Sequence, residues 1–180
     1  MNTGQTLLSV GAVVLLGMTV LMTNRTSLQH GTIINSTEVG IYAVSLAQAK
    51  IEEAAGKAFD TYSSSDTAGN GNVITSLSQL THYDKLGKES GETYPNFDDF
   101  DDYNYFSGNN PYKMWVDGVD SFYVQTTVCY VDTTAPDVPV NYSTWSKRMT
   151  VKVWPSISPW VTGKPDTVTM NFIYTYWWFR

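Results

Sequence analysis

Oxygen-bearing side chains gather between residues 98 and 104 and could bind a cation. They are Asp98, Asp99, Asp101, Asp102 and Asn104. Ca²⁺ takes about six to eight oxygen ligands, so this run is a candidate Ca²⁺ site. The spacing does not match an EF-hand loop, which needs glycine at the sixth position and glutamate at the twelfth. The simpler interpretation is a solvated acidic turn flanked by buried Phe97 and Phe100.

Residue types that carry catalysis are scarce in this sequence. It has two histidines, His30 and His82, and one cysteine, Cys129. One cysteine excludes an intrachain disulfide, a multi-cysteine metal site and a c-type haem attachment motif. No nucleophile elbow, phosphate-binding loop, dinucleotide fingerprint or H-E-x-x-H motif occurs. We therefore expect no enzymatic activity and no cofactor, with Ca²⁺ as the candidate ion. We expect Cys129 to be a small buried residue in a strand.

The charge of the chain argues against nucleic acid as a partner. The formal net charge is −6, and the 11 lysine and arginine residues are scattered. Nucleic-acid binding needs a basic patch, so we predict none. Of the three N-x-[ST] sequons, those at Asn24 and Asn35 fall on a predicted helix, and Asn141 falls in a predicted loop. Asn141 is therefore the glycan candidate.

The elements that position these residues begin with an unusual N-terminal segment. The first charged side chain is Arg25, and an apolar run occupies residues 7–22. The segment lacks the basic region and the cleavage site of a typical signal peptide. Helical spacing continues beyond it and predicts one helix over about residues 5–59, roughly 80 Å long. A domain of this size cannot bury such a helix, so lipid or other copies of the chain must cover its apolar part. The residues expected in this filament-core surface are Leu7, Leu8, Val10, Val13, Val14, Leu15, Leu16, Val20 and Leu21.

The second half of the predicted helix has an apolar stripe that includes Ile41, Val44 and Ile51, with Lys50 and Glu53 on the polar side. We expect this stripe to pack on a sheet. Apolar and polar residues alternate in three later segments, which predicts three strands joined by hairpins. These segments are residues 122–131, 147–154 and 168–179.

The predicted fold is α+β, with an antiparallel sheet of three to four strands on the C-terminal half of the helix. Residues 1–60 form the helix, of which residues 1–30 are the filament-core or membrane segment. Residues 61–180 form a β-rich body, in which residues 61–116 are mostly loops with one short helix near residues 76–80.

The start of the chain resembles that of type IV pilins and pseudopilins with a class III-type N-terminal helix. In that family a glycine precedes a cleaved bond and is followed by an apolar residue, Thr, Leu, an aliphatic residue, Glu and an apolar run. The positions that match are Gly4, Thr6, Leu7, Leu8, Val13 and Val14. Residues 45–53 resemble the A-x-x-K-[ILM]-E-E pattern common in minor pilins and pseudopilins, and residues 97–104 are a third match.

The resemblance implies leader cleavage between Gly4 and Gln5. Ser9 stands where the family has a glutamate that is thought to pair with the new amine, and residues 1–4 contain no basic side chain. The resemblance also implies a homo-oligomer: a structural subunit of an extracellular bacterial filament, held in the inner membrane before assembly. One alternative is a minor pilin or a type II secretion pseudopilin. Another is a membrane-anchored surface domain for binding or adhesion.

Overall fold

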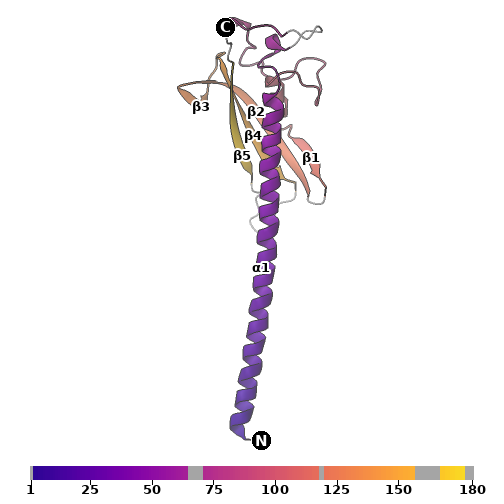
Figure 1. Ribbon diagram of the computed structural model, residues 1–180, viewed down its shortest axis with the longest axis vertical. Helices are drawn as coiled ribbons and strands as arrows, with labels where there is room; N and C mark the ends of the chain where they lie inside the picture. The colour runs from indigo at the N-terminus through magenta and orange to yellow at the C-terminus, as the bar shows by residue number, and fades with distance from the viewer. Residues whose placement is uncertain (1, 65–70, 118–119, 157–166, 177–180) are drawn as a thin grey trace. The chain divides into compact units, whose positions relative to one another are not determined.

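The computed structural model describes residues 2–64, 71–117, 120–156 and 167–176 (Figure 1). The chain divides into two compact units, Met1–Val39 and Gly40–Arg180. Helix α1, Thr3–Ala55, forms the first unit and continues into the second, where it is the first element. The predicted long N-terminal helix is confirmed, and it ends at Ala55 rather than near Phe59.

The second unit contains a five-stranded antiparallel sheet with the order β1-β2-β4-β5, in which β3 pairs with β2. The three predicted strands correspond to β2, β4 and β5, so the α+β prediction is confirmed at this level. Residues 177–179 of the third predicted strand lie outside the described residues. Two strands, β1 and β3, were not predicted. The strands are β1 Tyr112–Val116, β2 Asp120–Asp132, β3 Ala135–Pro139, β4 Ser146–Pro155 and β5 Val168–Thr175.

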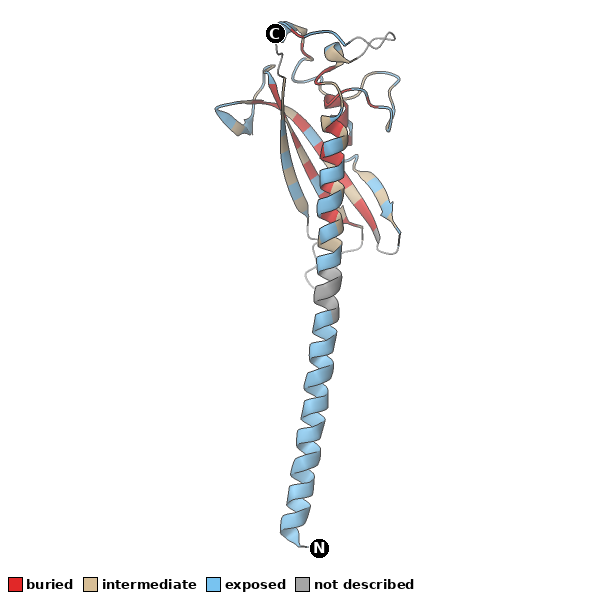
Figure 2. Ribbon diagram, in the orientation of Figure 1, coloured by how far each residue is buried: buried red, intermediate tan, exposed pale blue. Residues whose placement is uncertain are grey.

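One face of this sheet is buried. In the register between β2 and β4, Val124 is opposite Val153 and Val128 is opposite Met149, and all four side chains are buried. The intervening residue Thr127 is exposed. Successive side chains of a strand point to opposite faces, so this alternation separates a core face from a solvent face. Figure 2 shows the buried positions along β2 and β4.

The C-terminal part of α1 buries mainly small residues within the second unit. The buried helical residues are Ala43, Ala47, Lys50, Ile51 and Ala54. Ile51 is buried as predicted, but Ile41 and Val44 are exposed, so the prediction for these two was wrong. The observed stripe is displaced by one residue from the predicted one, a rotation of about 100°. Three of the five buried positions are alanines, whereas the larger side chains of Ile41 and Val44 lie outside.

The described chain between α1 and β1 contains short 3₁₀ helices. They are η1 Thr61–Ser63, η2 Leu77–Gln79 and η3 Asp101–Phe106. The predicted short helix near residues 76–80 is η2, which begins with a capping box between Ser76 and Gln79. A cluster of buried side chains from this region and from β2 adds to the core of the unit. Its members are Phe59, Ile74, Leu80 and Tyr130.

Candidate functional site

The N-terminal part of α1 presents a continuous apolar surface. The segment Thr3–His30 is long and apolar enough to cross a membrane, and none of its most apolar window is buried within the structure. Between Leu7 and Met22 the large hydrophobic side chains are 51–78% exposed, and the nine residues predicted for the filament core are all among them. Val13, Val14, Leu15 and Leu16 are consecutive and exposed, so apolar side chains point in every direction around the helix.

Four hydroxyls of this segment donate to the backbone of their own helix. The hydroxyls of Ser9, Thr19 and Thr23 each donate to the backbone carbonyl four residues earlier, at 2.9, 2.6 and 2.5 Å. Thr26 makes the same bond to Met22 at 2.9 Å. A hydroxyl that donates to its own helix can enter an apolar environment without another partner. These four hydroxyls therefore do not prevent the burial of the helix in an apolar environment.

The leader-cleavage candidates Gly4 and Gln5 lie exposed in the first turn of α1. The Gln5 amide donates to the carbonyl of Asn2 at 2.8 Å. The Ser9 hydroxyl donates to the carbonyl of Gln5 at 2.9 Å. Cleavage at this position stays a prediction.

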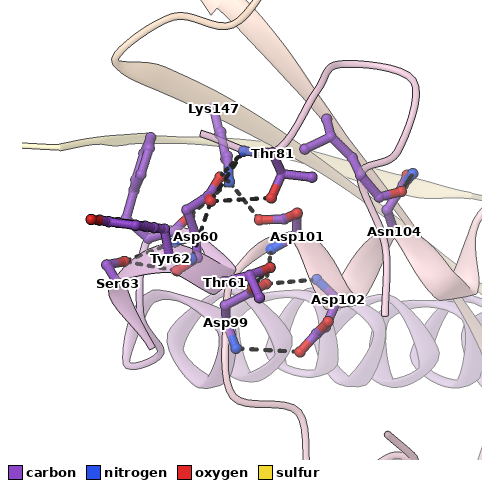
Figure 3. A network of polar contacts seen from close by, with 12 residues as sticks. Asp60, Thr61, Tyr62, Ser63, Thr81, Asp99, Asp101, Asp102, Asn104 and Lys147 are labelled. Atoms are coloured by element: carbon purple, nitrogen blue, oxygen red, sulfur yellow. Dashed lines mark hydrogen bonds and ion pairs between the residues drawn. The ribbon is translucent and has the colours of Figure 1, made fainter. Parts of the chain in front are cut away.

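A buried lysine joins three distant segments of the second unit (Figure 3). Lys147 of β4 donates to the Asp60 carboxylate at 2.6 Å, to the Asp101 carboxylate at 2.5 Å and to the Phe59 carbonyl at 2.8 Å. The three charged side chains are 0–1% exposed. Asp60 also accepts from the amide and the hydroxyl of Thr81, at 3.1 Å each. This network fixes the end of α1 against the sheet and the following loop.

Aspartates 99 and 102 cap each other at the start of η3 (Figure 3). The Asp102 amide donates to Asp99 Oδ1 at 3.1 Å, and the Asp99 amide donates to Asp102 Oδ2 at 3.3 Å. Asp102 Oδ2 accepts a second amide, that of Asp98, at 3.1 Å. The Thr61 hydroxyl lies 2.7 Å from Asp99 Oδ2 and 2.5 Å from Glu89 Oε1, so two carboxylates share one hydroxyl proton.

The acidic run is therefore not a solvated turn. Asp98 is exposed, but Asp99, Asp101 and Asp102 are completely buried, and that part of the interpretation was wrong. Phe97 and Phe100 are buried as predicted. Residues Phe97, Phe100, Tyr103 and Phe106 recur at intervals of three, the period of a 3₁₀ helix. That spacing is a sequence signal for η3 and places these aromatic side chains on one face of it.

The structure brings two of the four predicted calcium ligands together with two acids that the sequence did not indicate. Carboxylate oxygens of Glu89, Glu92, Asp98 and Asp102 all lie within 4.8 Å of one another. Asp99 forms the reciprocal cap and Asp101 binds Lys147 instead. We call this set of four residues the carboxylate cluster.

Burial dominates the ionisation of these acids. It raises the pKa of Asp102 to about 8, with the Asp99 charge as the next contribution. Burial also raises the pKa of Asp99. The pKa of Asp101 is raised well above its usual range, mainly by burial and despite the Lys147 ammonium. Burial thus favours the neutral, protonated forms of these acids.

A second buried lysine comes from the helical segment that resembles the pilin pattern. Lys50 Nζ donates to Glu53 and to the Tyr94 hydroxyl, at 2.8 Å each, and Glu53 accepts from the Tyr103 hydroxyl at 2.9 Å. The ammonium lies 4.3 Å from the centre of the Tyr94 ring and 5.4 Å from that of Tyr112. Lys50 was expected on the polar side of the helix, and this expectation was wrong. Its role is to connect α1 to the aromatic core.

The glycan candidate Asn141 lies at the surface, and Cys129 lies in the sheet. Asn141 is exposed in the segment between β3 and β4, so its side chain is accessible to modification. Cys129 lies in β2 as predicted, and it is only half-buried. Its thiol contacts the Arg148 guanidinium at 3.7 Å, and burial raises the thiol pKa.

Comparison of the chain with protein-family models, with curated proteins and with solved structures finds no match.

Proposed function

We propose that this chain is the structural subunit of an extracellular, type IV pilus-like helical filament that assembles through its apolar N-terminal helix. The observation that carries the proposal is the exposed apolar surface of the Leu7–Met22 stretch, within a helical segment long and apolar enough to cross a membrane. Burying one such Leu or Val side chain is worth about 1.5–3 kcal/mol. A surface of this kind does not remain in water and needs a partner along its whole length.

The distribution of apolar side chains favours several neighbours over one. A two-stranded coiled coil covers a single stripe of each helix and leaves the opposite face polar. Here consecutive positions from Val13 to Leu16 are all apolar and exposed. Lipid, or a bundle of surrounding helices, covers such a helix on every side. The two environments fit successive stages, with the subunit in the inner membrane first and in the filament core afterwards.

Two further features support the filament stage. Ile41 and Val44 extend the exposed apolar surface of α1 beyond the segment that a membrane would cover, so neighbouring subunits are the better partners there. Ser9 replaces the glutamate of the pilin pattern and satisfies its own hydroxyl on the Gln5 carbonyl. A serine bonded in this way can be buried between helices without the amine partner that a carboxylate would need.

A single substitution tests the proposal. Val13→Asp places an unpaired carboxylate on the apolar surface, where burial is strongly unfavourable, and filament yield should fall at least tenfold. Val138→Asp is the matched control, because Val138 is an exposed valine of β3. Filaments are measured by sedimentation and electron microscopy, and the β-sheet signal in circular dichroism reports on the second unit. A normal yield of filaments from Val13→Asp would refute the proposal.

The native assembly separates the alternatives. Thr3–His30 has 28 residues. A helix of that length spans about 42 Å, more than the roughly 30 Å of a bilayer core, so an anchored binding or adhesion domain is the rival reading. That reading predicts monomers released by detergent. Long filaments of one repeating subunit support a major pilin-like subunit, whereas short assemblies support a minor pilin or a pseudopilin.

A further inference from the structure

The carboxylate cluster gathers four acids from two separate stretches of chain. Glu89 and Glu92 lie on the loop between η2 and η3, and Asp98 and Asp102 flank the start of η3. Each contributes an oxygen, and these oxygens lie within 4.8 Å of one another. Like charges at such distances repel, so the arrangement needs an explanation beyond packing.

Two oxygens of the cluster are buried without a hydrogen-bond partner among the described residues. They are Asp102 Oδ1 and Glu89 Oε2. Asp102 is 0% exposed, and its other oxygen, Oδ2, is held by the amides of Asp98 and Asp99. The second oxygen of Glu89, Oε1, accepts from the Thr61 hydroxyl. In both side chains one oxygen is fixed by the protein and the other is left for a ligand.

Protein cations do not fill this role in the part of the chain that the structure describes. Lys88 is adjacent in sequence, but its ammonium donates to the Glu92 main-chain carbonyl at 2.9 Å. Lys147 is taken by Asp60 and Asp101. The described ion pairs include none of the four cluster carboxylates.

We propose that Glu89, Glu92, Asp98 and Asp102 bind one Ca²⁺ ion. An all-oxygen, all-carboxylate set suits a hard cation rather than zinc, which favours nitrogen and sulfur ligands. Mg²⁺ usually keeps several waters and binds through one or two carboxylates, whereas Ca²⁺ accepts six to eight oxygen ligands in flexible geometry. Four carboxylates on a loop and a short 3₁₀ helix therefore favour Ca²⁺. Exposed Asp98 places the site at the surface, where water completes the coordination.

The cation would also have a structural effect. Glu89 and Glu92 form a turn of their own, in which the Glu89 amide donates to Glu92 Oε2 at 2.9 Å and Gly91 has a φ of +102°. Asp102 belongs to η3, which contacts β2. Binding of Ca²⁺ between these groups ties the loop to the sheet through η3.

Calorimetric titration of the full chain in a non-ionic detergent, after chelator treatment, tests the proposal. We expect one Ca²⁺ per chain at pH 7.5, with a Kd between about 10 µM and 1 mM and at least tenfold weaker binding of Mg²⁺. Asp98→Asn and Glu89→Gln should each weaken Ca²⁺ binding at least tenfold. Asp137→Asn removes an exposed acid of β3 outside the cluster and should leave the Kd unchanged.

Thermal unfolding provides a second readout and controls for misfolding. Saturating Ca²⁺ should raise the melting temperature of the wild-type chain and of Asp137→Asn, but not that of Asp98→Asn. Because the Asp98 side chain is exposed, its replacement should leave the melting temperature without Ca²⁺ unchanged. Absence of saturable binding up to 10 mM Ca²⁺, equal affinity for Mg²⁺, or unchanged affinity in Asp98→Asn and Glu89→Gln would each overturn the proposal.

Discussion

Replacing Lys147 with methionine should be among the most destabilising single changes in the second unit. Methionine keeps most of the side-chain volume but removes an ammonium that donates to Phe59, Asp60 and Asp101 at 2.5–2.8 Å. Both carboxylates would remain at 0–1% exposure. Breaking a buried ion pair by removing one partner destabilises proteins by about 3–5 kcal/mol.

An independent estimate gives the same magnitude. The variant can avoid a buried unpaired charge by protonating a carboxylate. For an aspartate of ordinary pKa, about 3.9, protonation at pH 7 costs about 4 kcal/mol at 1.36 kcal/mol per pH unit. This cost falls as the pH is lowered, so the loss of stability at pH 5.5 should be about 2 kcal/mol smaller than at pH 7.

Urea unfolding of the full chain in a non-ionic detergent, followed by circular dichroism, measures the effect. Lys152→Met is the matched control, because Lys152 is also in β4 but is exposed on the opposite face. Its free energy of unfolding should differ from that of the wild type by no more than about 0.5 kcal/mol. The double variant Lys147→Met/Asp101→Asn should be more stable than Lys147→Met, since it removes one of the unpaired acids. A loss below about 1 kcal/mol in Lys147→Met, with no dependence on pH, would refute the reasoning.

Two further predictions concern the helix contact and the acids of η3. Ala47 is completely buried, so Ala47→Leu should lower the free energy of unfolding by about 1–3 kcal/mol, whereas Ala49→Leu, at an exposed position, should not. Similar urea midpoints for the two variants would contradict this packing. In the presence of a chelator, the folded chain holds a proton on Asp102 up to about pH 8 that the unfolded chain loses near pH 4. Stability should therefore fall as the pH rises from 5 to 8, and Asp102→Asn should flatten this fall; a wild-type melting temperature that rises over this range would show the opposite linkage.

The regular elements could be predicted because their periodicities are local. Alternation located β2, β4 and β5, and helical spacing located α1. The strand β3 escaped because it contains Pro136 and Pro139, which indicate loops in a sequence. Proline lacks the amide donor that a central strand needs, but β3 pairs with β2 only near Asp132, where an edge position tolerates it.

The candidate sites could be predicted only in part, because their partners are far apart in sequence. Asp101 binds a lysine 46 residues away, and the carboxylate cluster needs Glu89 and Glu92 from a loop without regular structure. Neighbouring residues of a 3₁₀ helix point about 120° apart, so consecutive aspartates of η3 cannot all face one ion. The helix face was misjudged because side-chain size suggested burial of Ile41 and Val44, while the buried positions are mostly alanines.

The buried aspartates accept hydrogen bonds from backbone amides of the loop region. Between residues 60 and 107 the described chain has short 3₁₀ turns and no strand, so few of its amides pair in a ladder. Carboxylates accept them instead: Asp60 takes the amide of Thr81, and Asp99 and Asp102 take each other's amides. A carboxylate has two oxygens and can accept hydrogen bonds from several amides at once, whereas a backbone carbonyl offers one oxygen. Burial disfavours the ionised forms of Asp99, Asp101 and Asp102, and Ca²⁺ at the carboxylate cluster offsets this cost for Asp102 by stabilising its charged form.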